Sequence, residues 1–156
     1  MSERLKQRLK QLKFISSMFN MAMDEFNNVM GPETIQTIFR LIGERQGEAV
    51  EERIRNKYGI DKWTPELFAE KITSDVIDPA VGTGTSEIKI NGNELSVVVK
   101  DCPFKRAGIK ISDKFYCTYT EGLIETFAKK ALNINEFKSL KLRAIDNCDC
   151  SFLLKV

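Results

Sequence analysis

The sequence predicts an α+β domain in which N-terminal helices pack on an antiparallel sheet that carries one late helix. Apolar residues recur at helical spacing up to about residue 77, and from residue 87 the pattern changes to a period of two. Helices that precede strands, instead of alternating with them, indicate an α+β arrangement. A length of 156 residues and a hydrophobic fraction of 42% are sufficient for one domain with a full core.

The first helix is predicted over residues 3–30, where apolar residues follow a 4-3 spacing until Gly31-Pro32 ends the pattern. The apolar seam is narrow at the start and widens after Phe14. This widening is typical of a helix whose start meets a partner and whose end enters a core. We therefore expect residues 1–30 to be a dimer arm and core helix, and residues 31–156 to be the ligand-binding domain.

The apolar seam of this helix predicts a homodimer. Leu5, Leu9 and Leu12 are expected at or near the interface. A core helix with a solvated basic face is an alternative, and so is a basic helix that binds a membrane surface or nucleic acid. Acidic residues at both ends dilute the basic charge that this last alternative requires.

A second helix is predicted over residues 33–57, with Gly43 and Gly47 inside it. Glycine inside a helix costs roughly 1 kcal/mol relative to alanine. The pair therefore indicates either close backbone contact with another helix or a break near Gly47. A third helix is predicted to begin with Thr64 as its cap and Pro65 at its first position.

Two hairpins complete the predicted sheet. Segments 87–90 and 94–99 flank Asn91-Gly92-Asn93, which is a hairpin signal. Segments 140–145 and 151–154 flank a turn over residues 146–149. These four segments predict an antiparallel sheet.

Three segments lie between these elements and before the closing hairpin. Residues 78–85 are expected to form a connector, since a phosphate cradle requires more glycines or a lysine-threonine pair. Ile109 and Ile111 alternate like a short strand. The stretch Thr118-Tyr119-Thr120-Glu121 matches a capping box, so a fourth helix is predicted from there to about residue 131.

All four cysteines lie after residue 100, and the chain contains no histidine. Cys102 follows a strand, Cys117 precedes a predicted helix, and Cys148 and Cys150 belong to the closing hairpin. In a reducing compartment such cysteines are metal ligands or thiols more often than disulfides. We expect at least three of them to bind one metal, zinc by default and an iron–sulfur cluster as the competitor. Buried packing cysteines and a redox-active thiol set are the alternatives.

Composition narrows the possible functions. A net charge of +2 does not indicate direct nucleic-acid binding, and no apolar run approaches the ~20 residues that span a bilayer. The charged N-terminus predicts a cytoplasmic protein. The absence of histidine and of a dinucleotide fingerprint disfavours an enzyme. An enclosed apolar cavity is expected, lined by Phe39, Phe68, Phe115, Tyr119, Leu123 and Phe127.

Four short motifs carry a resemblance to a known family. They are Gly43-Glu44-Arg45-Gln46-Gly47-Glu48-Ala49, Cys102-Pro103, Cys117-Thr118-Tyr119-Thr120-Glu121-Gly122 and Cys148-Asp149-Cys150-Ser151-Phe152. Over about residues 31–156 the chain resembles the 4-vinyl reductase domain family, also called hydrocarbon-binding. The resemblance implies an α+β fold related to a vesicle-tethering subunit and to nitric-oxide-sensor-like ligand-binding domains. It also implies a pocket for small hydrophobic molecules between helices and sheet, and dimers that use N-terminal helices.

The resemblance extends to the metal site. Several family members bind zinc through one cysteine before a helix, two cysteines near the closing hairpin and an acidic residue. Cys117, Cys148 and Cys150 match the three cysteines, although the family usually spaces the last two more widely. The acidic residue has no clear counterpart here, so Cys102 is the expected fourth ligand.

Two function classes follow from these observations. The first is a non-catalytic domain that binds or senses a small hydrophobic ligand, carries a structural zinc site and acts on a regulatory protein partner. The second is a vinyl-group reductase or accessory enzyme of tetrapyrrole pigment synthesis, which is the other role that the resemblance implies.

Overall fold

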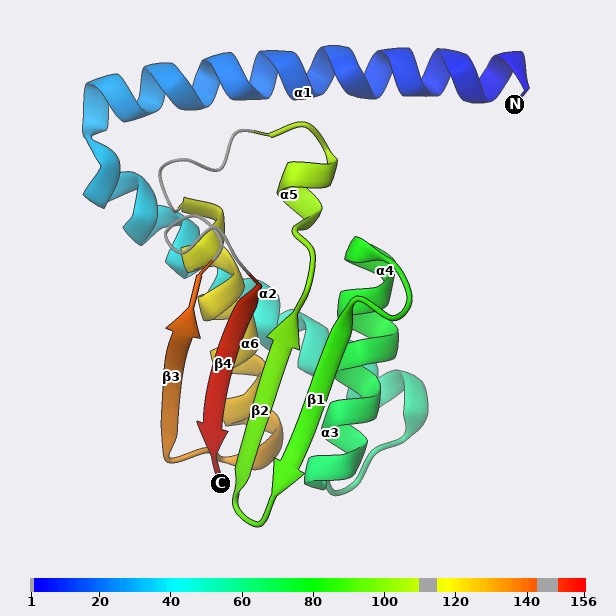
Figure 1. Cartoon of the computed structure of the whole chain (residues 1–156), viewed down its shortest axis with the longest axis vertical. Coiled ribbons are helices and arrows are strands. Elements are labelled where there is room, and N and C mark those ends of the chain that lie inside the picture. The colour runs from blue at the N-terminus through cyan, green and yellow to red at the C-terminus, as the bar shows by residue number, and fades with distance from the viewer. Residues whose placement is uncertain (1, 110–114, 143–148) are drawn as a thin grey trace.

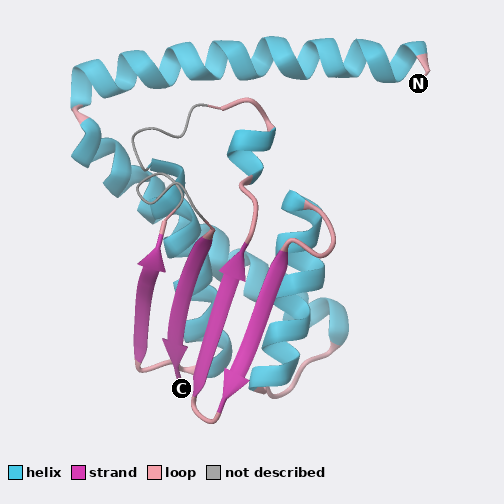
Figure 2. Cartoon of the chain, in the orientation of Figure 1, coloured by secondary structure: helices cyan, strands magenta, loops and turns pink. Residues whose placement is uncertain are grey.

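A computed structural model describes residues 2–109, 115–142 and 149–156 (Figure 1). The predicted α+β fold is confirmed: helices come first and cover one face of a four-stranded antiparallel sheet in the order β1-β2-β4-β3 (Figure 2). The long helix α1 lies across one end of this body. Helices α2, α3 and α6 form the layer behind the sheet, and the core lies between the two layers.

The two long N-terminal helices are confirmed. Helix α1 spans Glu3–Met30, and the Ser2 side chain accepts a hydrogen bond from the Leu5 amide at its start. Gly31 separates it from α2, Pro32–Tyr58, with a φ of +80° that glycine adopts readily. Proline at the first position of α2 loses no hydrogen bond, because the first amides of a helix have no partner within it.

Close backbone contact, and not a break, explains the glycines of α2. Gly43 and Gly47 are buried where α2 crosses α6, Phe115–Leu132. A Cβ at Gly47 would lie 2.6 Å from the Leu123 carbonyl oxygen, and a Cβ at Gly43 would meet the carbonyl of Tyr119. Gly122 on α6 makes the reciprocal approach, so the two backbones are in direct contact.

The third helix begins as predicted. Thr64 accepts a hydrogen bond from the Leu67 amide at 3.2 Å at the start of α3, Pro65–Ile72. A π-helical turn, η1, Thr73–Ile77, and a short helix, α4, Asp78–Val81, continue it. The expected connector over 78–85 is therefore wrong for its first four residues, which form helix α4.

The first hairpin is confirmed. Strands β1, Ser86–Asn91, and β2, Glu94–Val99, are joined at Gly92, which takes a φ of +61°. Leu95, Val97 and Val99 of β2 alternate as buried residues toward the helices.

The segment after β2 differs from the prediction. Pro103–Arg106 forms a short helix, α5, and Ile109 belongs to no strand; Ile111 lies outside the described residues. Helix α6 begins at Phe115, three residues before the predicted capping box. Thr118 is therefore inside the helix, and its hydroxyl donates to the Gln36 carbonyl of α2 at 3.1 Å. The hydroxyl thus reaches a second helix and does not cap its own.

The closing strands pair antiparallel. Strand β3 spans Glu136–Lys141 and begins before the predicted segment 140–145, whereas β4 spans Cys150–Lys155. Most of the predicted turn over 146–149 lies outside the described residues. Strand β4 also pairs with β2, and this pairing sets Val99 opposite Cys150.

Candidate functional site

An apolar cavity of about 220 Å³ lies between α2, α6, the segment 75–81 and α5. Its inner wall is aliphatic and comes from residues that are buried in the core, including Val50, Ile77 and Ile124. Exposed residues such as Arg53 and Ala80 also line it, so the cavity opens to the surface and is not enclosed as expected. The full lining is Gln46, Val50, Arg53, Asp75, Val76, Ile77, Ala80, Val81, Val99, Pro103, Phe104, Tyr119, Thr120, Leu123 and Ile124.

Helix α2 supplies one wall of the apolar cavity. Gln46, Val50 and Arg53 follow one another at spacings of four and three, so they share one face of the helix. The glycine face of α2 is turned toward α6, and this close approach sets how far apart the two walls lie. The helix therefore presents an amide, an aliphatic side chain and a guanidinium along one edge of the cavity.

The acid at the mouth of the cavity is held by its neighbours. The Asp75 carboxylate accepts hydrogen bonds from Lys57 Nζ at 2.8 Å, Ser74 Oγ at 2.8 Å and Tyr58 Oη at 3.1 Å. Partial burial raises the pKa of Asp75, but the hydrogen bonds from Lys57, Ser74 and Tyr58 outweigh it and lower the pKa below its ordinary value. Asp75 is therefore an ionised, fully engaged carboxylate.

The two tyrosines of the first turns of α6 remain protonated. Burial raises the pKa of Tyr119, and burial together with the charge of Asp24 raises the pKa of Tyr116 to about 12. Both rings pack on Phe104 of α5, Tyr116 stacked at 4.5 Å between centroids and Tyr119 edge-on at 5.8 Å. Helix α5 thus forms one wall of the apolar cavity and is held there by aromatic contacts with α6.

Three cysteines from separate elements line a second, smaller cavity of about 30 Å³ beside the first. Cys117 is buried in the first turn of α6, whereas Cys102 and Cys150 are half-buried. The pairing of β2 with β4 brings Cys150 close to the end of β2, and Cys102 follows three residues later. We call this the cysteine cavity. It shares Val99, Pro103, Phe104 and Thr120 with the apolar cavity.

The cysteine cavity holds three of the four predicted metal ligands. Within residues 2–109, 115–142 and 149–156, no group of three or more cysteine, aspartate or glutamate side chains is arranged to hold a metal ion. Cys148 lies outside the described residues, so the predicted set of four is described only in part. The three described cysteines line one cavity, and the zinc site remains a prediction.

The predicted ligand residues fall into three groups. Tyr119 and Leu123 line the apolar cavity. Phe68 and Phe127 are fully buried and pack on each other in the core at 5.1 Å between ring centroids. Phe39 packs edge-on against Tyr116, away from the cavity, and the side chain of Phe115 lies outside the described part of the chain.

Sequence reasoning missed the residues of α2 and of the segment 75–81 that line the cavity. The signal for α2 was available, because Gln46, Val50 and Arg53 lie on one helical face beside the glycines. Val76 and Ile77 were expected on the apolar face of the third helix, and a π-helical turn places them at the cavity. For Ala80 the sequence carried no comparable signal.

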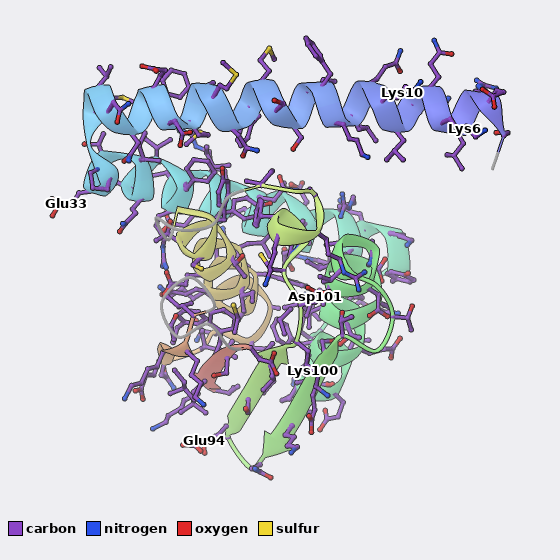
Figure 3. The ribbon with its side chains drawn as sticks, turned by 45° about the horizontal axis from the view of Figure 1, so that its top comes forward. Lys6, Lys10, Glu33, Glu94, Lys100 and Asp101 are labelled. Carbon is purple, nitrogen blue, oxygen red and sulfur yellow. The ribbon has the colours of Figure 1, made fainter. Side chains whose placement is uncertain are left out.

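Helix α1 leaves an open groove between itself and the body. The groove is lined by Leu9 and Leu12 of α1 and by Phe104 and Ile109 below it. The Ser16 hydroxyl donates to the Ala107 carbonyl at 3.1 Å and tethers α1 over the groove. Figure 3 shows Lys6 and Lys10 on the end of α1 that extends past the body.

The apolar surface of α1 is extensive. Leu5, Leu9 and Leu12 are 52%, 43% and 63% exposed, and Phe14 is 72% exposed. Met23 is buried against Ile35 and Tyr116. The helix is therefore in contact with the body near its C-terminal end, while much of its apolar surface faces solvent. None of the described helices is long and apolar enough to cross a membrane.

Comparison with known proteins supports the fold. No family model and no curated protein matches this chain. A crystal structure of a trafficking protein particle complex subunit 3 from Naegleria fowleri, covalently bound to palmitic acid, matches with a TM-score of 0.55. The match covers 93% of this chain and 94% of that chain at 12% identity. The chain has a vesicle-tethering-type fold. At this identity the likeness shows the fold alone, and it confirms the relationship to a vesicle-tethering subunit that the family resemblance implied.

Proposed function

We propose that this chain is a non-catalytic module that binds a small hydrophobic ligand in the apolar cavity. The observation that carries the proposal is the cavity of about 220 Å³, which has an aliphatic inner wall and a few polar groups at its mouth. Ligand sites are typically concave and mostly apolar, with a small number of placed polar groups. An engineered apolar cavity of about 150 Å³ binds benzene, so this volume suits a ligand with a slightly larger apolar part.

The structural neighbour gives independent support. That trafficking subunit is described as covalently bound to palmitic acid, so a fold of this type is compatible with holding an apolar chain. The same subunit belongs to a multi-protein complex, which supports a protein partner for the present chain. The membership in the 4-vinyl reductase family, which the cysteine motifs suggest, is part of the same proposal.

The size of the cavity disfavours the enzymatic alternative. A tetrapyrrole contains several rings, whereas a cavity of about 150 Å³ is filled by one. At about 220 Å³ the apolar cavity can surround little more than one ring of such a pigment, which makes it a poor fit for a vinyl-group reductase. We therefore favour binding or sensing over reduction of a tetrapyrrole.

The proposal includes a homodimer formed through α1. Leu5, Leu9 and Leu12 are all more than two-fifths exposed, and burial of such side chains drives association. Basic residues gather before residue 14, whereas Asp24 and Glu25 lie near the other end. An antiparallel pair of α1 helices would bring opposite charges together, so a second copy is the partner that the charges favour.

The proposal also includes a structural zinc ion at the cysteine cavity. Cys102, Cys117 and Cys150 line it, and Cys148 is two residues from Cys150. Thiolates from three separate elements would link β2, α6 and the closing hairpin, because a metal bound only in the folded state adds to folding stability. Such thiols must stay reduced, which agrees with the proposed cytoplasmic location.

The test of ligand binding uses 1-octanol as the probe and isothermal titration calorimetry as the readout. Val76→Phe adds a ring to a half-buried wall of the cavity and should abolish binding, and Ala80→Phe at the mouth should weaken it. Val29→Phe is the matched control, because Val29 is 81% exposed on α1 and lines no part of the cavity. If 1-octanol does not bind, or binds Val76→Phe and wild type equally, the proposed function is wrong.

A further inference from the structure

One cation at the mouth of the apolar cavity has no partner within the described parts of the chain. Two other arginines of α2 are engaged: Arg40 pairs with Glu44 and Glu125, and Arg55 pairs with Glu51. By contrast, Arg53 makes no hydrogen bond or ion pair within residues 2–109, 115–142 and 149–156. A guanidinium offers five N–H donors in a planar fork, and Arg53 is an exposed residue that lines the cavity.

We propose that the ligand is an amphiphile whose carboxylate is held by Arg53 while its apolar tail fills the apolar cavity. This inference rests on the proposed function and names the class of ligand for the same site. The Arg53 guanidinium stands one turn beyond Val50, which is buried in the cavity wall. The stem of an arginine packs along apolar surface while its head stays in water, which suits a ligand that crosses from cavity to solvent.

The charges around the mouth select an anionic head. Asp75 lines the same cavity, but Lys57 is paired with it at 2.8 Å, so these two charges offset each other. The charge of Arg53, +1, is what remains for a ligand. A single positive charge in a fork geometry matches one carboxylate, whereas a phosphate monoester carries nearly two negative charges at neutral pH.

The other polar groups of the cavity complete the recognition of the head. Gln46 lies on the same face of α2 as Arg53, two turns away, and its amide can donate to an oxygen. The raised pKa of Tyr119 keeps its hydroxyl protonated, so it is also available as a donor. A cavity of about 150 Å³ binds benzene, which has six carbons. The apolar cavity of about 220 Å³ therefore suits an apolar tail of about eight carbons.

The experiment compares octanoate with 1-octanol, which have the same number of carbons and differ in the head. Titration calorimetry is performed on the full chain in wild type, Arg53→Gln and Arg45→Gln. Arg45 is the matched control, because it is also an exposed arginine of α2 but does not line the apolar cavity. Arg53→Lys is a second variant that keeps the charge and removes the fork.

Octanoate should bind wild type about tenfold more tightly than 1-octanol, since a charge-assisted pair adds roughly one decade in affinity. Arg53→Gln should bind octanoate about tenfold more weakly than wild type does, and its affinity for 1-octanol should stay within twofold of wild type. Arg53→Lys should bind octanoate about threefold more weakly than wild type. Arg45→Gln should change the affinity for neither octanoate nor 1-octanol. Thermal melts identify any variant that does not fold, in which case Arg53→Lys carries the comparison.

The failures are distinguishable. One outcome is that 1-octanol binds, Val76→Phe abolishes that binding, and octanoate binds no more tightly with Arg53 than without it. In that case the inference of a carboxylate amphiphile is wrong and the proposed function stands. If octyl phosphate binds wild type more tightly than octanoate, the choice of a carboxylate is overturned. If neither octanoate nor 1-octanol binds, the proposed function and this inference are both wrong.

Discussion

Replacing Gly43 by alanine tests whether the close approach of α2 and α6 holds the cavity walls in place. In an open helix this change would stabilise the protein by about 1 kcal/mol, because alanine is the better helix former. Here the new Cβ would collide with the Tyr119 carbonyl, and a backbone atom cannot turn away as a flexible side chain can. Overpacking of a tight contact costs about 1–3 kcal/mol, and a backbone clash belongs at the upper end.

The two terms predict a net loss of about 2 kcal/mol in the free energy of unfolding for Gly43→Ala. Urea unfolding followed by circular dichroism measures it, and the midpoint should fall by about 1 M for a slope near 2 kcal/mol/M. Gly122→Ala should behave similarly, since its Cβ would lie 2.5 Å from the Arg40 carbonyl oxygen. In the double variant the losses should be less than additive, because one separation of the helices relieves both clashes.

The control is Gly59→Ala. Gly59 ends α2 with a φ of +61° and has open space around its Cα, so alanine there suffers backbone strain but no clash. Its loss should be independent of Gly43→Ala, and the two should add. If Gly43→Ala is as stable as wild type or more stable, the helices are not in direct contact and the reasoning about the cavity walls is wrong.

Three further predictions concern stability, metal and assembly. Glu51 is 2% exposed and accepts hydrogen bonds from Trp63 and Arg55; burial raises its pKa, but these bonds lower it below the ordinary 4.5 overall. The contribution of Glu51 to the free energy of unfolding is therefore present above about pH 4.5 and is lost as the pH falls through the lower folded-state pKa. In thermal melts at acid pH, wild type should lose more stability than Glu51→Gln, and equal losses would refute this. Cys117→Ser should lower zinc content and melting temperature together, measured by metal analysis and thermal melts without chelator; a wild type that carries no metal and gains no stability from added zinc would show that no zinc site exists. Light scattering at tens of micromolar should report a dimer for wild type and a monomer for Leu9→Glu, and a monomeric wild type would contradict the interface.

The sequence by itself determined the elements whose ends depend on local chemistry. Gly31 and Pro32 divide the first two helices, because one adopts a positive φ and the other has no amide to lose. Thr64 caps α3 through its own hydroxyl, and Gly92 takes the positive φ at the hairpin between β1 and β2. In each case the residues that decide the structure are neighbours in the chain, so the pattern could be recognised without the fold.

Residues of the candidate site were predictable from the sequence only where they lie together on one helix. Tyr119 and Leu123 were expected to line a ligand pocket, and both line the apolar cavity because they lie on one face of α6. Phe68 and Phe127 have the same apolar character but pack on each other in the core. Character alone does not distinguish a core residue from a cavity residue, since that depends on which elements meet there.

The tertiary structure decided the contacts that join distant segments. Thr118 fits a capping box in sequence, yet its hydroxyl bonds Gln36 of another helix and α6 begins earlier. The pairing of β2 with β4 sets Val99 opposite Cys150 and so gathers cysteines that are far apart in the chain. Arg53 became a candidate for ligand recognition only when the fold left it unpaired at the mouth of a cavity within the described residues. The energies of these contacts depend on residues dozens of positions apart, and local sequence patterns do not report such distances.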